Sequence, residues 1–380
     1  MAFALGYVLS AGVRGRSSTN IEQQQPILLR CFWICTGLTC FAYMIWLAVG
    51  VKNGFRPGMI LDFINMNNSK LETFEFKERI FPTVPGITTL TQCGMIAVML
   101  GLLPCLRSKP YVKITIAMII AAAFLRGMML SERLALIELV VTMGIVFLRT
   151  DVLGKLRSLA LKLGLRVAPI VGPVLLLVLF GSFEYFRSYR HYQDRFNNIA
   201  EFTIWRVSAY YTLGHNNSAL VMEKRGVWPL PFTTLSAVWT FPLVRHSPFS
   251  YAKLTGIEPD KAYNQLLRMH GVPEYNNEGG LFAPLMDYGI FGFAIYWCGA
   301  GFLCGVAYRA YLAGSTVGLC FYPLLYLSLL ETPRYIYVCL SRATPQILII
   351  LFLWYLFTQR STRQTVPALD CPSSGAESPA

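Results

Sequence analysis

Long apolar stretches recur along the whole of this 380-residue chain, and they limit what it can fold into. A helix needs about 20 mostly apolar residues to cross a membrane. Eight stretches reach or approach that length: 27–51, 86–104, 111–130, 132–149, 167–186, 288–308, 316–333 and 343–358. Charged residues make up only 14% of the chain, whereas a soluble domain carries about 25%. The sequence therefore predicts an all-α polytopic membrane protein with about eight to nine transmembrane helices.

The lysines and arginines of the short connections predict how these spans are oriented. Cytoplasmic loops of membrane proteins carry an excess of both residues. The basic groups are Arg14/Arg16/Arg30, Arg107/Lys109/Lys113, Arg149/Lys155/Arg157/Lys162/Arg166, Arg309 and Arg360/Arg363. With eight spans, all of these groups fall on one side, which we assign to the cytoplasm. Anionic membrane lipids therefore explain the net charge of +13, and no nucleic acid is expected as a partner.

The spans divide the chain into four predicted parts. These are an N-terminal transmembrane bundle with short loops (1–186), a mainly helical loop domain on the outer side (187–287), the C-terminal transmembrane helices (288–358) and a disordered cytoplasmic tail (359–380). Segment 203–222, rich in Trp and Tyr, predicts an amphipathic helix in the membrane interface, and 151–166 predicts a basic one on the inner surface. Residues 1–13 are apolar but too short to span, so they are either the stub of a longer first span or a helix half-embedded in the bilayer.

Cysteine and histidine spacing gives no metal signature. None of the ten cysteines lies in 187–287, which excludes a disulfide scaffold there. All four histidines lie in that stretch and form neither an H-E-x-x-H motif nor a close pair. A P-loop, a dinucleotide fingerprint and a G-x-S-x-G motif are also missing from the sequence. We therefore expect neither a metal nor a cofactor.

Four arginines lie at span ends on the outer side, where the topology disfavours basic residues. They are Arg126, Arg133, Arg334 and Arg342. Guanidinium groups grip phosphate in a bidentate manner, and ionisable groups at membrane depth usually have a task. We expect Arg133, Arg334 and Arg342 to bind a lipid pyrophosphate, with Arg126 and Arg206 as second choices. The alternative is that each arginine snorkels to the head groups or pairs with Glu132, Glu138 or Glu331.

A polar, glycine-rich segment, residues 276–292, runs directly into a predicted span. Paired glycines let a backbone approach a ligand closely or adopt positive φ. A carboxylate at the membrane boundary is partly desolvated, which raises its pKa and suits it to act as a general base. We expect Glu278 to be that base, with Asp287 and His215 as reserves; the alternative is a plain loop with two solvated acids. The residues expected to contact a glycan are Tyr210, Tyr211, Asn216, Asn217 and Asn277.

Several short motifs together resemble one known family. They are Val84-Pro85-Gly86-Ile87-Thr88-Thr89-Leu90, Ser131-Glu132-Arg133-Leu134-Ala135, Tyr210-Tyr211 through Asn216-Asn217, Asn277 through Gly292, Pro333-Arg334-Tyr335 and Ser341-Arg342. In this order the pattern resembles the bacterial O-antigen and exopolysaccharide repeat-unit polymerases (Wzy-type), which are related to the O-antigen ligases. The ligases carry His-[Asn/Ser/Gln]-x9-Gly-x-x-Gly, whereas this chain has Glu278-Gly279-x9-Gly289-Ile290-Phe291-Gly292. That departure argues against a ligase.

The resemblance implies a GT-C-like, metal-independent, inverting glycosyltransferase of the bacterial inner membrane, with its large loop domain and active site in the periplasm. Its substrate would be an undecaprenyl-pyrophosphate-linked oligosaccharide, polymerised into O-antigen, capsule or exopolysaccharide. A chain-length regulator and a flippase would be partners besides the membrane lipids. Two alternatives stay open: a ligase that passes the glycan to another acceptor, and a polysaccharide transporter or flippase.

Overall fold

The computed structural model describes residues 1–13, 24–59, 79–130, 133–150, 174, 177–189 and 192–364. This part of the chain is helical and contains no strand. The helices of its first half are α1 (Ala2–Leu9), η1 (Ser10–Gly12), α2 (Gln25–Lys52), η4 (Thr88–Gln92), α5 (Cys93–Gly101), α6 (Pro104–Arg107), α7 (Pro110–Leu130) and α8 (Arg133–Arg149). Those of its second half are η5 (Tyr185–Tyr189), η6 (Gln193–Arg195), α12 (Ile199–Lys224), α13 (Ser236–Trp239), α14 (Pro242–Arg245), α15 (Tyr251–Thr255), α16 (Pro259–His270), α17 (Ala283–Leu312), α18 (Thr316–Glu331), η7 (Tyr337–Cys339), η8 (Ser341–Ala343) and α19 (Thr344–Gln364).

Four helical segments in the described residues are long and apolar enough to cross a membrane. They are Gln25–Lys52, Pro110–Gly127, Ala283–Leu312 and Ser341–Gln359. Shorter apolar helices occur at Ala2–Gly12, Thr88–Gly101 and Thr316–Glu331. The predicted all-α character is confirmed, and the apolar helices are those of a helical membrane protein. The predicted inner-surface helix 151–166 lies outside the described residues, as do 167–173, 175 and 176 of the predicted span 167–186. The same is true of 365–380 of the predicted tail, whereas 359–364, predicted to be disordered, continue the last helix, α19.

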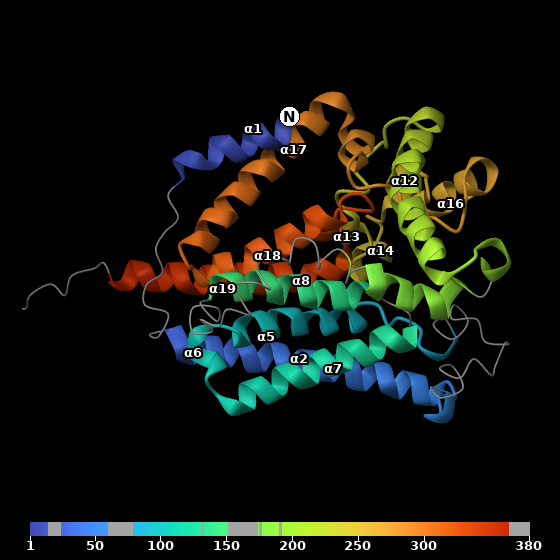
Figure 1. The fold of residues 1–380 in the computed structure, drawn as a ribbon. Coiled ribbons are helices and arrows are strands. Elements are labelled where there is room, and N and C mark those ends of the chain that lie inside the picture. The colour runs from blue at the N-terminus through green and yellow to red at the C-terminus, as the bar shows by residue number, and fades with distance from the viewer. Residues whose placement is uncertain are drawn as a thin grey trace, which may run out of the picture.

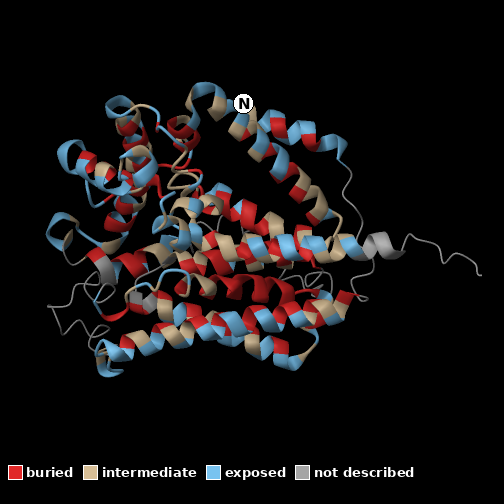
Figure 2. Ribbon diagram, turned by 180° about the vertical axis from the view of Figure 1, so that it is seen from behind, coloured by how far each residue is buried: buried red, intermediate tan, exposed pale blue. Residues whose placement is uncertain are grey.

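Helix α5 forms the centre of a bundle made with α2, α7, α8, α18 and α19 (Figure 1). Every residue of α5 is buried, because this helix is apolar all round and neighbours cover each of its faces. Figure 2 shows the buried residues concentrated in these inner helices, while α2 and α7 expose their outer faces. The outward side chains of α2 include Trp33, Ile34 and Met44, as expected of a helix that faces lipid.

Consecutive helices of the bundle run in alternating directions, so the helix ends gather at two opposite ends of the bundle. Figure 1 shows the end of α7, the start of α8, the end of α18 and the start of α19 at the same end, beside α12 and α16. Arg126, Arg334 and Arg342 therefore share this end, which we call the arginine end. The basic connection around α6 lies at the opposite end, as the charge pattern predicts.

The N-terminal segment packs along α17 through glycines. A Cβ atom on Gly6 would lie 1.8 Å from the carbonyl oxygen of Cys298, and one on Gly301 would lie 2.0 Å from that of Phe3. A Cβ on Gly305 would collide with the Ser10 hydroxyl. Small residues allow two apolar helices to approach this closely inside a membrane. Segment 1–13 is thus a short helix lying against α17, and the sequence pattern did not predict this contact.

Candidate functional site

The glycine-rich segment lies between α12 and the loop that joins α18 to α19. The Gly279 amide donates a hydrogen bond to the Arg334 carbonyl, with 3.0 Å between nitrogen and oxygen. A Cβ on Gly214 would lie 2.8 Å from the Pro333 carbonyl oxygen, and one on Gly280 would lie 2.5 Å from the Tyr335 carbonyl carbon. Glycine at these positions lets three backbone segments touch. Three of the motifs on which the family resemblance rests therefore meet at one place.

Polar side chains of α12 form hydrogen bonds to the backbone of the same glycine-rich segment. The Asn217 amide nitrogen donates to the carbonyl oxygens of Tyr275, at 2.6 Å, and Asn277, at 3.0 Å. The Ser218 hydroxyl donates to the carbonyl oxygen of Glu278. Because Gly214, Asn217 and Ser218 lie on one face of α12, this helix presents a polar buried stripe to the segment. The helix predicted over 203–222 is present, but this stripe faces protein.

Replacing Gly279 by alanine is expected to destabilise the protein strongly. Gly279 has φ of +74°, and an added Cβ would lie 2.5 Å from both the Gly214 carbonyl oxygen and the Ser218 hydroxyl. The backbone conformation alone costs a non-glycine residue about 1–3 kcal/mol, and the collision adds to it. Gly256→Ala is the matched control, since its φ is +71° and open space surrounds it. Thermal unfolding in detergent measures both, and equal losses would contradict the close contact.

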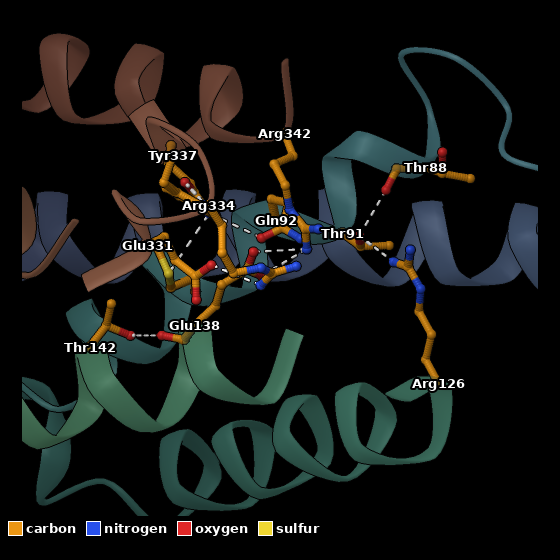
Figure 3. A network of polar contacts seen from close by, with 12 residues as sticks. Thr88, Thr91, Gln92, Arg126, Glu138, Thr142, Glu331, Arg334, Tyr337 and Arg342 are labelled. Carbon is orange, nitrogen blue, oxygen red and sulfur yellow. Dashed lines mark hydrogen bonds and ion pairs between the residues drawn. The ribbon is translucent and has the colours of Figure 1, made fainter. Parts of the chain in front are cut away.

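Arg342 reaches Glu138 of α8 across the arginine end (Figure 3). The Arg342 Nη2 atom lies 2.8 Å from Oε1 and 3.0 Å from Oε2 of Glu138. The Glu138 side chain is 2% exposed, whereas that of Arg342 is 28% exposed. The carboxylate is therefore inside the protein, and the guanidinium covers it from the surface.

Arg334 forms the second pair, with Glu331 at the end of α18. The distance from Arg334 Nη1 to Glu331 Oε2 is 2.9 Å, and Arg334 Nε is buried with no hydrogen-bond partner among the described residues. The guanidinium lies over the Tyr335 ring, 4.9 Å from its centroid, and over the Tyr210 ring at 5.7 Å. Aromatic faces stabilise a cation that has left water. The Arg334 Nε–H group can thus still donate a hydrogen bond to a ligand, and the two tyrosine rings stabilise the positive charge of the guanidinium.

Arg126 lies at the edge of the same network. Its Nη1 atom donates to the Thr91 hydroxyl at 2.8 Å, and its guanidinium lies 5.9 Å from the centroid of the Trp46 ring. Arg126 and Glu138 line one pocket of about 20 Å³, room for about one water molecule. The side chain of Arg133 lies outside the described residues. Three of the four arginines predicted at span ends therefore lie around one group of polar side chains.

A set of buried amides and hydroxyls, which the sequence pattern did not predict, lies beneath the arginines. The Gln346 amide nitrogen donates to the Gln92 side-chain oxygen at 3.1 Å and to the Tyr337 hydroxyl at 3.3 Å. Both glutamines lie near the ends of apolar helices, where polar residues are rare, and that position is the signal that could have revealed them. These contacts tie η4, η7 and α19 together below Arg342 (Figure 3).

Glu278, the predicted base, is partly buried beside the Gly279–Arg334 contact. Its Oε2 atom accepts a hydrogen bond from the Thr233 hydroxyl at 3.3 Å. Burial raises the pKa of this carboxyl to about 7, helped by the negative charge of Asp260 and, more weakly, of Asp287, while the Thr233 hydrogen bond opposes the rise. A carboxyl with a pKa near neutrality is suited to take a proton from a hydroxyl group.

Asp287, a predicted reserve base, is engaged in structure instead. Its Oδ1 atom accepts hydrogen bonds from the amides of Phe232 and Thr233, at 3.0 and 3.1 Å. Its Oδ2 atom accepts from the amide and the hydroxyl of Thr234, both at 2.6 Å. This buried carboxylate, with four donors, holds the 232–234 turn against α17, and its oxygen atoms are already occupied by hydrogen bonds. Gly289, with φ of +67°, then interrupts α17 just after this anchor.

Arg206, a second choice for the pyrophosphate, is likewise engaged elsewhere. Its Nε atom lies 3.1 Å from Glu184 Oε2, and its Nη2 atom lies 2.6 Å from Glu274 Oε1. Its Nη1 atom donates to the Tyr275 hydroxyl at 2.6 Å, and three tyrosine rings surround the guanidinium. The side chain is 1% exposed, so a phosphate does not reach it. Arg206 joins α12 to the segment that precedes Glu278.

The other predicted residues have different surroundings. His215 packs edge-on against Phe282, and its Nδ1 atom is buried without a hydrogen-bond partner in the part of the chain that the structure describes. Tyr211 and Asn216 are exposed, Asn277 is partly buried, and Tyr210 and Asn217 are buried. Buried Tyr210 and Asn217 hold the site together, so the predicted glycan contacts reduce to Tyr211, Asn216 and Asn277.

Within the described ranges, no three His, Cys, Asp or Glu side chains gather as a metal site would require. No family model, no curated protein and no solved structure matches the chain.

Proposed function

We propose that this protein polymerises undecaprenyl-pyrophosphate-linked oligosaccharide repeat units at the periplasmic face of the bacterial inner membrane. The observation that carries the proposal is the gathering of Arg126, Arg334 and Arg342 at one end of an apolar helix bundle, beside a glycine-rich loop with a carboxyl of raised pKa. Arginines at the end of an apolar helix bundle are suited to bind the phosphate groups of a lipid. A carboxyl that titrates near neutrality suits the activation of a sugar hydroxyl.

The reaction is a displacement at the reducing-end sugar of the growing glycan. A hydroxyl oxygen of the incoming repeat unit attacks the anomeric carbon from the face opposite the pyrophosphate. The bond between that carbon and the phosphate oxygen breaks, and undecaprenyl pyrophosphate leaves with the electron pair. The hydroxyl proton passes to Glu278, and the configuration at the anomeric carbon inverts.

Arginines can take the place of a metal in this scheme. Negative charge develops on the leaving pyrophosphate as its bond to the sugar lengthens. Fixed positive groups aimed at that charge stabilise the transition state without having to reorganise. Arg334, stacked on Tyr335 and tied to the Gly279 amide through its own carbonyl, is held in such a fixed position.

The finer features of the fold belong to the same proposal. They are eight spans in a GT-C-like bundle, the arginine end in the periplasm, 187–287 as the periplasmic domain, and membership in the repeat-unit polymerases. Exposed Tyr211 and Asn216 would contact sugars, because aromatic faces and amides are common in sites that bind polar ligands. A chain-length regulator and a flippase would work beside the polymerase.

Assembly in vitro from a purified lipid-linked repeat unit tests this function. The wild-type protein should convert the single unit into a ladder of longer chains on a gel. Arg133→Ala protein of wild-type abundance that still makes long chains would remove Arg133 from the proposed site. Transfer of one unit to a different acceptor would point to a ligase, and uptake of substrate without a ladder would point to a transporter.

Chain extension is expected to keep its full rate in excess EDTA, because guanidinium groups supply the positive charge that a divalent metal would otherwise supply. The measurement is the initial rate before and after chelation, followed by re-addition of Mg²⁺ or Mn²⁺. A rate that falls on chelation and returns with the metal would argue against this mechanism.

A further inference from the structure

Two of the arginines at the proposed site are already paired with carboxylates. Arg342 holds Glu138 at 2.8 and 3.0 Å, and Arg334 holds Glu331 at 2.9 Å. The glutamate side chains are 2% and 8% exposed, and the arginine side chains 28% and 18% exposed. In each pair the carboxylate is thus the more buried partner, and the arginine side chain is the one that is partly open to a ligand.

We propose that Glu138 and Glu331 determine specificity: as built-in counter-ions they make the site select a pyrophosphate over a single phosphate group. The inference rests on the proposed function, because it takes the pyrophosphate of a lipid donor as the ligand. It assigns the two glutamates a role in choosing between anions, in addition to holding the arginines in place.

The charge balance gives the reason. Each pair is neutral, so a phosphate that approaches Arg334 or Arg342 must compete with a carboxylate already in contact. A ligand with one phosphate gains one guanidinium and remains close to the repelling carboxylates. A ligand with two linked phosphates gains both guanidiniums, and its second contact is formed within a complex that already exists. Specificity of this kind comes from penalising the wrong ligand.

The two pairs are near enough to act on one ligand. Arg334 lies over the Tyr335 ring, 4.9 Å from its centroid. Burial raises the pKa of the Tyr335 phenol, and the charges of both pairs act on it, the arginines lowering it and the glutamates raising it. Figure 3 shows Arg334 and Arg342 approaching the same polar network. Arg126, which lines a pocket with Glu138, adds a third positive charge beside the two neutral pairs.

Glutamine is the informative replacement at both positions. It keeps the size of the side chain and an oxygen that accepts from arginine, but it removes the negative charge that competes with phosphate. Glu331→Asp keeps the charge and should therefore keep the selectivity. Glu223→Gln is the matched control, because Glu223 pairs with Lys224 on the surface of α12 and takes no part in the site.

Binding of inorganic pyrophosphate and inorganic phosphate to the purified full-length protein, measured by calorimetry in detergent, tests the inference. The wild type should prefer pyrophosphate. Glu138→Gln and Glu331→Gln should each bind phosphate more tightly and lower the preference about tenfold, a usual size for coupling between neighbouring sites. Glu331→Asp and Glu223→Gln should keep the wild-type ratio.

Two results would overturn the inference, and they differ in what they say of the proposed function. If the wild type binds pyrophosphate and folded Glu→Gln variants keep its selectivity, the counter-ion role is wrong while the anion site remains. If the wild type binds no pyrophosphate, and Arg334→Ala behaves in the same way, the anion site itself fails and the inference fails with it. Melting curves show which variants are folded, and the two positions give independent results.

Discussion

Arg334→Ala is expected to lower the rate of chain extension by about 10²–10³-fold, the usual effect of removing one group that stabilises developing negative charge. The substitution removes the guanidinium that lies over Tyr210 and Tyr335 and whose Nε has no partner in the described structure. Because this charge acts mainly on the leaving pyrophosphate, kcat should fall more than KM rises. Initial rates at several concentrations of lipid-linked donor separate the two parameters.

Two further variants show whether the loss comes from the site. Arg334→Lys keeps the charge but loses the planar fork that grips two phosphate oxygens, so its rate should lie between those of alanine and the wild type. Arg225→Ala removes a surface arginine that lies over Trp228 and should leave chain extension unchanged. A folded Arg334→Ala protein with a wild-type rate would exclude a role for Arg334 in stabilising the leaving group.

The helices were predictable because apolar length is a local property of the sequence. Stretches of about 20 apolar residues gave α2 and α7 close to their observed bounds. The packing of the short N-terminal helix could not be predicted in the same way. Its contact with α17 depends on Gly6 meeting a carbonyl almost 300 residues away, at Cys298, and neither hydropathy nor charge indicates such a contact.

The sequence indicated where the arginines lie along the spans, but it did not indicate the partner of each charged side chain. Arg126, Arg334 and Arg342 lie at one end of the bundle, and Arg342 and Arg334 pair with Glu138 and Glu331, as the alternative interpretation had it. Binding of a pyrophosphate by these arginines stays a prediction. Whether Arg206 and Asp287 are available to a ligand could not be predicted from their position in the sequence. Arg206 is neutralised by Glu184, 22 residues earlier, and Asp287 is saturated by a turn more than 50 residues upstream. Such long-range contacts decide whether a charged side chain is available to a ligand.

Glu278→Gln is expected to lower chain extension by about 10²–10⁴-fold, the usual contribution of a general base. It should also change the pH profile. Burial raises the pKa of Glu278 to about 7, so this carboxyl is protonated and inactive below that pH and ionised above it. The wild-type rate should therefore rise with pH and level off above about 7. The residual rate of the glutamine variant should lack this rising limb of the pH profile.

Two neighbours of Glu278 allow the limb to be moved in opposite directions without removing the base. Asp260→Asn takes away a negative charge that helps to raise the Glu278 pKa, so the limb should move to lower pH. Thr233→Val takes away a hydrogen bond to the ionised carboxylate, so the limb should move to higher pH; the Thr233 amide still donates to Asp287. Rates of both variants from pH 5 to pH 9 would measure the shifts. A limb that stays in place in both variants would mean that a group other than Glu278 accepts the proton. His215, whose buried Nδ1 has no partner among the described residues, would then be the next residue to replace.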